Sequence, residues 1–238
     1  QVNAGWDKYA EKTSAVQTIM AATSKDFKDT ATQMGYVNNQ LQKLNWFTDE
    51  TSYNFTDMVG NIGKFTSNGI KLDKSVTAMQ GIATWAARSG ANANEASRAM
   101  YNLSQALSVG AVKLIDWKSI ENANMATAEF KENALEAAAA LGTLKKKGDG
   151  TYVTMKNNAV SVSNFNEALS DAWFTSDVLL NVLDRYGGFT NKLYEVADAT
   201  DLTATQLLSA IDKYADGTLD LQSYAAATGN DVEELRGY

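Results

Sequence analysis

The residues best suited to hold a metal ion lie in the range Asp212–Ser223. Five of them match loop positions of a calcium-binding EF-hand, namely Asp212, Asp216, Gly217, Leu219 and Asp220. Tyr214 stands where the loop uses Asp or Asn, and Ser223 stands where it uses a bidentate glutamate. Because two strong ligands are missing, we interpret the stretch as a turn between two helices and not as a calcium site.

Two pairs of carboxylates have the chemistry for acid and base catalysis. Asp116 lies close in sequence to Glu121, and Glu129 lies close to Glu132. A glycosidase-like pair also needs a cleft and shifted pKa values, which residue spacing does not provide. Solvated helix faces are therefore the simpler interpretation, and a lysozyme-like carboxylate hydrolase ranks below the two functions discussed last.

Histidine and cysteine are absent, which limits nucleophilic and metal chemistry. Ser/His/Asp and Cys/His arrangements need an imidazole to take the proton, and structural zinc sites need His or Cys ligands. Gly81, Gly90 and the pair Gly187–Gly188 lack the spacing and the following lysine of a phosphate-binding loop. We interpret them as close-packing or helix-ending positions. We predict no catalytic, cofactor or metal site, and hence no enzyme.

Charge argues against nucleic-acid binding. The formal net charge is −7, so the average surface repels phosphates, and no dense Lys/Arg stripe is present to overcome this. The run Lys145–Lys147 lies beside a tight turn, where lysines keep an exposed hairpin from pairing with other chains. We expect no sequence-specific contact with nucleic acid.

The elements that position these residues are mainly helices. Proline is absent, so glycines and capping residues mark the helix ends. Apolar residues at helical spacing predict one helix across Trp6–Met20 and, after a break at Thr23–Ser24, another across Phe27–Leu44. Further helices are predicted at Thr56–Phe65, Val76–Ala87, Ala93–Leu107 and Ala123–Leu141, bounded by Gly69, Gly90, Gly110 and Gly142.

Between residues 143 and 163 the pattern changes to that of short strands. Leu144–Lys147 and Tyr152–Met155 flank the turn Gly148–Gly150, and Val160 alternates with Val162. We predict a small hairpin or a three-stranded sheet here. Helices then resume at Asn164–Trp173 and Asp177–Arg185, pause at Gly187–Gly188, and continue at Leu193–Ala197, Thr205–Tyr214 and Leu219–Thr228.

The predicted fold class is mainly α, a compact multi-helix bundle with a small sheet near 143–163. We divide the chain into a helical domain at 1–142, a hairpin insertion at 143–163 and a second helical lobe at 164–238. Capping boxes at Asn92 with Glu95 and at Thr203 with Gln206 mark two helix starts.

Large aromatic residues lie within these apolar patterns. The five tryptophans are Trp6, Trp46, Trp85, Trp117 and Trp173. Because large aromatics at helical spacing usually fill a core or an interface, we interpret them as core residues. Gln1 and a helical pattern at Asp231–Leu235 that reaches the end of the chain lead us to expect a fragment of a longer protein.

One run of residues is unusual enough to indicate a family. Leu114–Met125, with the sequence LIDWKSIENANM, resembles a hallmark segment of bacteriophage tail tape measure proteins. Further blocks resemble the same family, at Gly5–Tyr9, Thr18–Met20, Asp57–Phe65, Ala78–Ile82 and Ala99–Gln105. The blocks follow a consistent order across Gly5–Ala140, and weaker similarity extends to Glu234.

The resemblance implies a structural and assembly function without catalysis. In this family a very long helical protein occupies the lumen of the growing tail, its length sets the tail length, and it leaves ahead of the genome. The expected location is then the tail-tube lumen of the virion, after synthesis in the host bacterial cytoplasm. The expected partners are further copies of the chain, tail-tube proteins and baseplate or tail-tip proteins, with host membrane contact through other parts of the full-length protein.

Short helices bounded by glycines indicate a chain that folds back on itself. A continuous helix advances about 1.5 Å per residue and suits a measuring rod, whereas this sequence suits a compact domain attached to such a rod. The alternative function is a helical secreted or cell-surface interaction module without catalysis, whose apolar faces pack on a partner.

Overall fold

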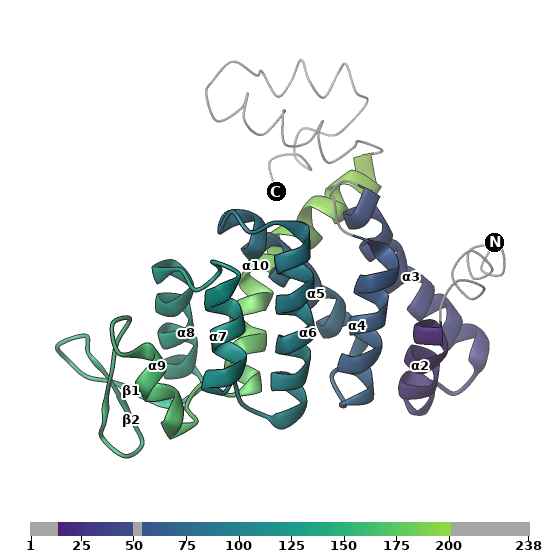
Figure 1. Cartoon of the computed structure of the whole chain (residues 1–238). Coiled ribbons are helices and arrows are strands. Elements are labelled where there is room, and N and C mark those ends of the chain that lie inside the picture. Colours follow the sequence, from purple (N-terminus) through teal and green to yellow (C-terminus); the bar gives the residue numbers. More distant parts are fainter. Residues whose placement is uncertain (1–13, 50–53, 201–238) are drawn as a thin grey trace.

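Helices dominate the structure because apolar residues recur at helical spacing and no proline interrupts them. The computed structural model describes residues 14–49 and 54–200. Figure 1 shows α4, α6, α7 and α8 side by side, with the small sheet at one end. The α-helices are α2 (Ser14–Thr23), α3 (Thr30–Asp49), α4 (Phe55–Ser67), α5 (Leu72–Arg88), α6 (Ala93–Val109), α7 (Leu114–Asn122), α8 (Ala128–Ala140), α9 (Phe165–Ala168) and α10 (Ser176–Thr200). The predicted mainly α class with a small sheet is confirmed.

Local signals fix most helix ends. Gly90 and Gly110 follow α5 and α6 with φ angles of 76° and 93°, a left-handed conformation that glycine adopts readily. At the start of α6, the Asn92 side chain accepts a hydrogen bond from the Glu95 backbone N–H at 3.0 Å, and the Glu95 carboxylate accepts one from the Asn92 N–H at 2.8 Å. The predicted capping box is therefore present.

The central contact of the bundle joins α5 to α10 through their backbones. A Cβ atom added to Gly81 would overlap the carbonyl oxygen of Leu183, and one added to Gly187 would overlap the carbonyl oxygen of Thr77. The interpretation of Gly81 and Gly187 as close-packing positions is thus confirmed. The predicted pause at Gly187–Gly188 is wrong, because α10 runs unbroken through both residues. Packing against α5 offsets the helix cost of glycine, which is about 1 kcal/mol.

The buried apolar residues form one cluster. On α10, Val178, Leu179 and Val182 are fully buried, and they belong to the same cluster as Val76 and Met79 of α5. The described part of the predicted second lobe therefore shares its core with the first helical region. The division at residues 142 and 163 itself stays a prediction.

Several predicted helices differ from the observed ones. The helix predicted at Phe27–Leu44 is observed as α3 at Thr30–Asp49, because Phe27 has an extended backbone after the 3-10 turn Ser24–Asp26. The helix predicted at Ala123–Leu141 is only α8, because Asn124 adopts a left-handed φ of 56° and the Thr127 side chain caps a new helix by accepting from the Phe130 N–H at 3.2 Å. Leu114–Asn122, where no helix was predicted, forms α7. The helix predicted at Asn164–Trp173 is shorter, consisting of α9 and the 3-10 turn Leu169–Asp171, because Ala172 then adopts a left-handed φ of 54°.

The sheet is antiparallel, with strand order β1-β2-β3. Its strands are β1 (Leu144–Lys146), β2 (Tyr152–Thr154) and β3 (Ala159–Val160). Lys145 lies opposite Val153, and Tyr152 lies opposite Val160. Leu144 and Val160 are buried members of the main core cluster, so the sheet packs against the helices. Of the predicted hairpin or three-stranded sheet, the structure has the three-stranded sheet.

Asp171 fastens the β2–β3 turn to the segment after α9. Its carboxylate accepts hydrogen bonds from the Asn158 amide at 2.8 Å, the Lys156 ammonium at 3.0 Å and the Thr154 hydroxyl at 2.9 Å. Only 10% of the Asp171 side chain is exposed. The hydrogen bonds, first that from Asn158, then those from Lys156 and Thr154, lower the pKa of Asp171 from 3.8 to about 2.

Alanine at Gly187 should destabilise the protein strongly. The new methyl group would press on the Thr77 carbonyl oxygen, and overpacking of this kind costs about 1 to 3 kcal/mol. Gly188 is the matched control, because no atom lies within 4 Å of a Cβ added there. We expect Gly188→Ala to be neutral or stabilising by up to about 1 kcal/mol. Urea unfolding followed by far-UV circular dichroism measures both, and equal effects would contradict the close contact.

Asparagine at Asp171 should lower stability at neutral pH and not in acid. A carboxyl whose folded pKa of about 2 is below the unfolded value of 3.8 stabilises the fold above pH 3.8. That contribution disappears as pH falls through the folded pKa. The difference in urea midpoint between wild type and Asp171→Asn should therefore shrink between about pH 4 and about pH 2. A difference that stays constant with pH would rule out the ionised carboxylate as its source.

Candidate functional site

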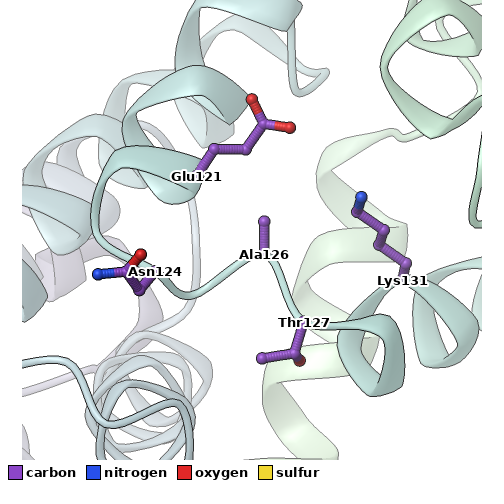
Figure 2. Close-up of a pocket in the computed structure, with 5 residues that line it drawn as sticks. All are labelled: Glu121, Asn124, Ala126, Thr127 and Lys131. Carbon is purple, nitrogen blue, oxygen red and sulfur yellow. The ribbon is translucent and has the colours of Figure 1, made fainter.

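An open pocket of about 310 Å³ lies between the end of α7 and the start of α8. Figure 2 shows Glu121 and Lys131 on opposite sides of it, with Ala126 between them. Asn124 and Thr127 complete the lining. Of the candidate residues predicted from sequence, only Glu121 lines this pocket.

The connection between α7 and α8 is held in place by its own backbone. The Asn124 N–H donates to the Glu121 carbonyl at 2.9 Å, and the Met125 N–H donates to the Ile120 carbonyl at 3.0 Å. The indole N–H of Trp85 on α5 donates to the Met125 carbonyl at 2.7 Å. These bonds turn the chain at the end of α7, and the short turn leaves the hollow between the two helices.

Glu121 is the most strongly bonded side chain of the pocket. The Lys118 ammonium lies 2.7 Å from one of its oxygens, and the Asn166 amide donates to the other at 2.7 Å. The hydrogen bond from Lys118 is the main cause of its lowered pKa, while partial burial acts in the opposite direction. Glu121 is therefore ionised at neutral pH.

This arrangement does not favour acid–base catalysis. A carboxyl that acts as an acid near neutral pH needs a raised pKa, and that of Glu121 is lowered. The carboxylate is also engaged by its two donors, which satisfy oxygens that a ligand would otherwise contact. In the described part of the chain, no three Asp or Glu side chains come together as a metal site would require. We regard the pocket as a feature of the helix connection.

Two of the other candidate carboxylates, Asp116 and Glu129, have structural contacts. Asp116 accepts a hydrogen bond from the Lys113 backbone N–H at 3.0 Å, at the start of α7. Glu129 forms an ion pair with Arg88 at 2.8 Å, and Glu132 is exposed on α8. Neither predicted pair lines the pocket together, because only Glu121 is part of its lining. Several predicted features lie outside the described residues. They are the range Asp212–Ser223, the Thr203–Gln206 capping box, Trp6 and the helices predicted at Thr205–Tyr214 and Leu219–Thr228.

An aromatic cluster lies at the centre of this region. The Trp85 and Phe130 rings stack with centroids 3.6 Å apart, and the ring centroids of Trp117 and Phe165 are 4.8 Å apart. Trp85, Trp117 and Trp173 are buried, so their interpretation as core residues is confirmed. Trp46 is partly buried against the same core. The run Leu114–Met125 thus supplies a central core residue, Trp117.

The same run also presents apolar residues to solvent. Ile115 is 77% exposed and Leu114 is 46% exposed at the start of α7, and Val109 at the end of α6 is 60% exposed. We call these three residues the apolar corner. Sequence reasoning missed it, although one signal was available. Ile115 is two positions before Trp117, which places the two side chains on opposite sides of a helix.

No helix within residues 14–49 and 54–200 combines the length and apolar character needed to cross a membrane. Comparisons of the chain with models of known protein families, with curated proteins and with solved structures find no match.

The pKa of Glu121 should depend on Lys118. Replacing Lys118 with methionine removes the largest cause of the lowered pKa, so the value should rise toward the ordinary 4.5. Titration of the Glu121 carboxyl carbon by NMR measures it. Lys145→Met is the control, because this exposed lysine lies on β1 and is not one of the groups that shift the Glu121 pKa. An unchanged Glu121 pKa in Lys118→Met would show that the ion pair does not persist in solution.

Proposed function

We propose that the chain is a structural and assembly component of a phage or phage-like tail, a compact domain of a tape measure protein. The support is the resemblance of Leu114–Met125 and of the further blocks to that family. The proposal includes no catalytic step. It agrees with the lowered pKa of Glu121 and with the structural contacts of Asp116 and Glu129.

The observation that favours an assembly role is the two-sided character of α7. Trp117 and Ile120 are buried and fix the helix to the core. Leu114 and Ile115, on the same helix, are exposed together with Val109. Exposed aliphatic side chains are typical of protein contact sites where they form a contiguous patch. We propose that the apolar corner contacts another tail component.

The proposed surroundings follow from the family. The chain would lie in the tail-tube lumen of the virion, associate with further copies of itself, and contact tail-tube and baseplate or tail-tip proteins. It would be made in the host bacterial cytoplasm and released during genome ejection. The short helices and the backbone contact between α5 and α10 suit a folded docking domain better than an extended rod.

The second candidate is a helical secreted or surface module that binds a partner protein. The exposed apolar corner favours this function as much as it favours the first. The position of the gene distinguishes the two, because a tape measure gene lies among tail-tube and baseplate genes. An isolated gene with a secretion signal would favour the module.

Tail length is the property that tests the proposal. In particles whose full-length protein has in-frame deletions, loss of a rod-forming helical stretch should shorten tails in proportion to the residues removed, at about 1.5 Å per residue. Loss of the present chain should instead block assembly or infection. Electron microscopy of purified particles measures both. Tails of unchanged length in both deletions would contradict the tape measure assignment.

A point substitution separates a docking role from a folding role. Ile115→Asp should fold normally, because the side chain is 77% exposed, and yet reduce the yield of assembled tails. Gln105→Asp, an exposed position on α6, is the matched control and should assemble normally. Normal assembly of Ile115→Asp would exclude the apolar corner as a contact site.

A further inference from the structure

Three helix ends meet beside the apolar corner. α6 ends at Val109, α7 begins at Leu114, and α10 begins at Ser176. Between them, Ala111 forms an antiparallel bridge with Thr175, which joins the α6–α7 connection to the residues before α10. Figure 1 shows the α6–α7 connection at the lower end of the bundle. The apolar corner therefore lies at an end of the bundle, where another molecule can approach it.

Two opposite charges flank the apolar corner. Lys113 directly precedes Leu114 in the chain. Asp177 directly follows Ser176, whose backbone N–H donates to the Gly110 carbonyl at 2.9 Å, so Asp177 belongs to the same end of the bundle. Lys113 and Asp177 are both exposed, and neither forms an ion pair with a described residue. The surface thus has one positive and one negative group without an ionic partner among the described residues.

The charged residues of α7 itself are engaged within the chain. The Lys118 ammonium lies 2.7 Å from a carboxylate oxygen of Glu121. The Asp116 carboxylate accepts a hydrogen bond from the Lys113 backbone N–H at 3.0 Å. These contacts leave the Lys113 ammonium and the Asp177 carboxylate as the flanking groups that are available to a partner.

A second copy of the same surface matches this arrangement. In a twofold pair, each residue of a patch meets another residue of the same patch on the other copy. With the axis through the apolar corner, its aliphatic side chains would meet their counterparts. Lys113 of each copy would then face Asp177 of the other. A partner of a single charge sign would instead place one of these two groups opposite a like charge, which is unfavourable.

We propose that the apolar corner is the contact between two copies of this chain, related by a twofold axis and flanked by two Lys113–Asp177 ion pairs. The proposal rests on the contact role of the apolar corner and specifies its partner. The aliphatic side chains supply the affinity by leaving water. The ion pairs are exposed at the rim, so they select the partner and fix its orientation more than they strengthen binding.

The size of the apolar corner sets the strength of this contact. A stable protein interface buries about 800 Å² on each partner, which is more than three aliphatic side chains supply. The pair is therefore weak, and it forms where copies are held at high local concentration. Copies that share one tail tube would be held in this way.

Sedimentation equilibrium of the purified full chain tests for the pair. Concentrations from about 10 μM to about 1 mM cover weak association of this kind. We expect a monomer–dimer equilibrium, which Ile115→Asp should weaken by about tenfold or more, because the new carboxylate would face the aliphatic side chains of the other copy. Gln42→Asp, an exposed position on α3, is the matched control and should dimerise like the wild type. Far-UV circular dichroism verifies that each variant folds.

A charge swap tests the twofold arrangement. Lys113→Asp and Asp177→Lys should each weaken the dimer, because each variant places two pairs of like charges across the axis. An equimolar mixture of the two variants should recover dimers, because both pairs across the axis then join opposite charges again. The double variant Lys113→Asp with Asp177→Lys should also dimerise, which shows that the single variants do not act through loss of folding.

Several results would overturn the proposal. These are a wild-type chain that stays monomeric at the highest concentration, a dimer that survives Ile115→Asp, or a mixture of charge variants that associates no better than either variant alone. Failure of the twofold pair can be told from failure of the contact role. A monomeric wild type with a reduced tail yield for Ile115→Asp would assign the apolar corner to a different tail protein, whereas a normal tail yield would exclude the contact role as well.

Discussion

The contact between α5 and α10 is made by backbone atoms, and the rest of the bundle is arranged around it. Gly81 and Gly187 let the two helices approach until the Leu183 and Thr77 carbonyls occupy the space where side chains would otherwise lie. At this separation α5 is buried on nearly every side, including polar Ser75 and Gln80. The other helices pack as a layer around this pair.

The aromatic cluster extends this arrangement to the run Leu114–Met125. Trp85 belongs to α5, stacks on Phe130 of α8, and donates its indole N–H to the Met125 carbonyl in the α7–α8 connection. The contacts of Trp85 on α5 therefore help to fix the position of α7. The exposure of Leu114 and Ile115 then follows, because Trp117 and Ile120 occupy the inner face of the same short helix.

Features that depend on local residues could be predicted from the sequence. The ends of α5 and α6 follow glycines, the start of α6 follows the Asn92 capping box, and the hairpin follows the Gly148–Gly150 turn. Features that depend on distant residues could not. In α10, Gly187 packs against Thr77, which is far away in the sequence, and the turn after Asn124 accepts a hydrogen bond from Trp85. The pocket beside Glu121 follows from that turn, so spacing alone did not reveal it.

The glycine contact also determines how the bundle responds to force. Two helices that touch through side chains can slide by exchanging one set of rotamers for another, whereas α5 and α10 touch through rigid peptide groups. A shift by one turn, about 5.4 Å, would bring residues with Cβ atoms into the space that Gly81 and Gly187 leave. We therefore expect the pair to resist sliding along the helix axes, so that a pull on α10 is transmitted to α5.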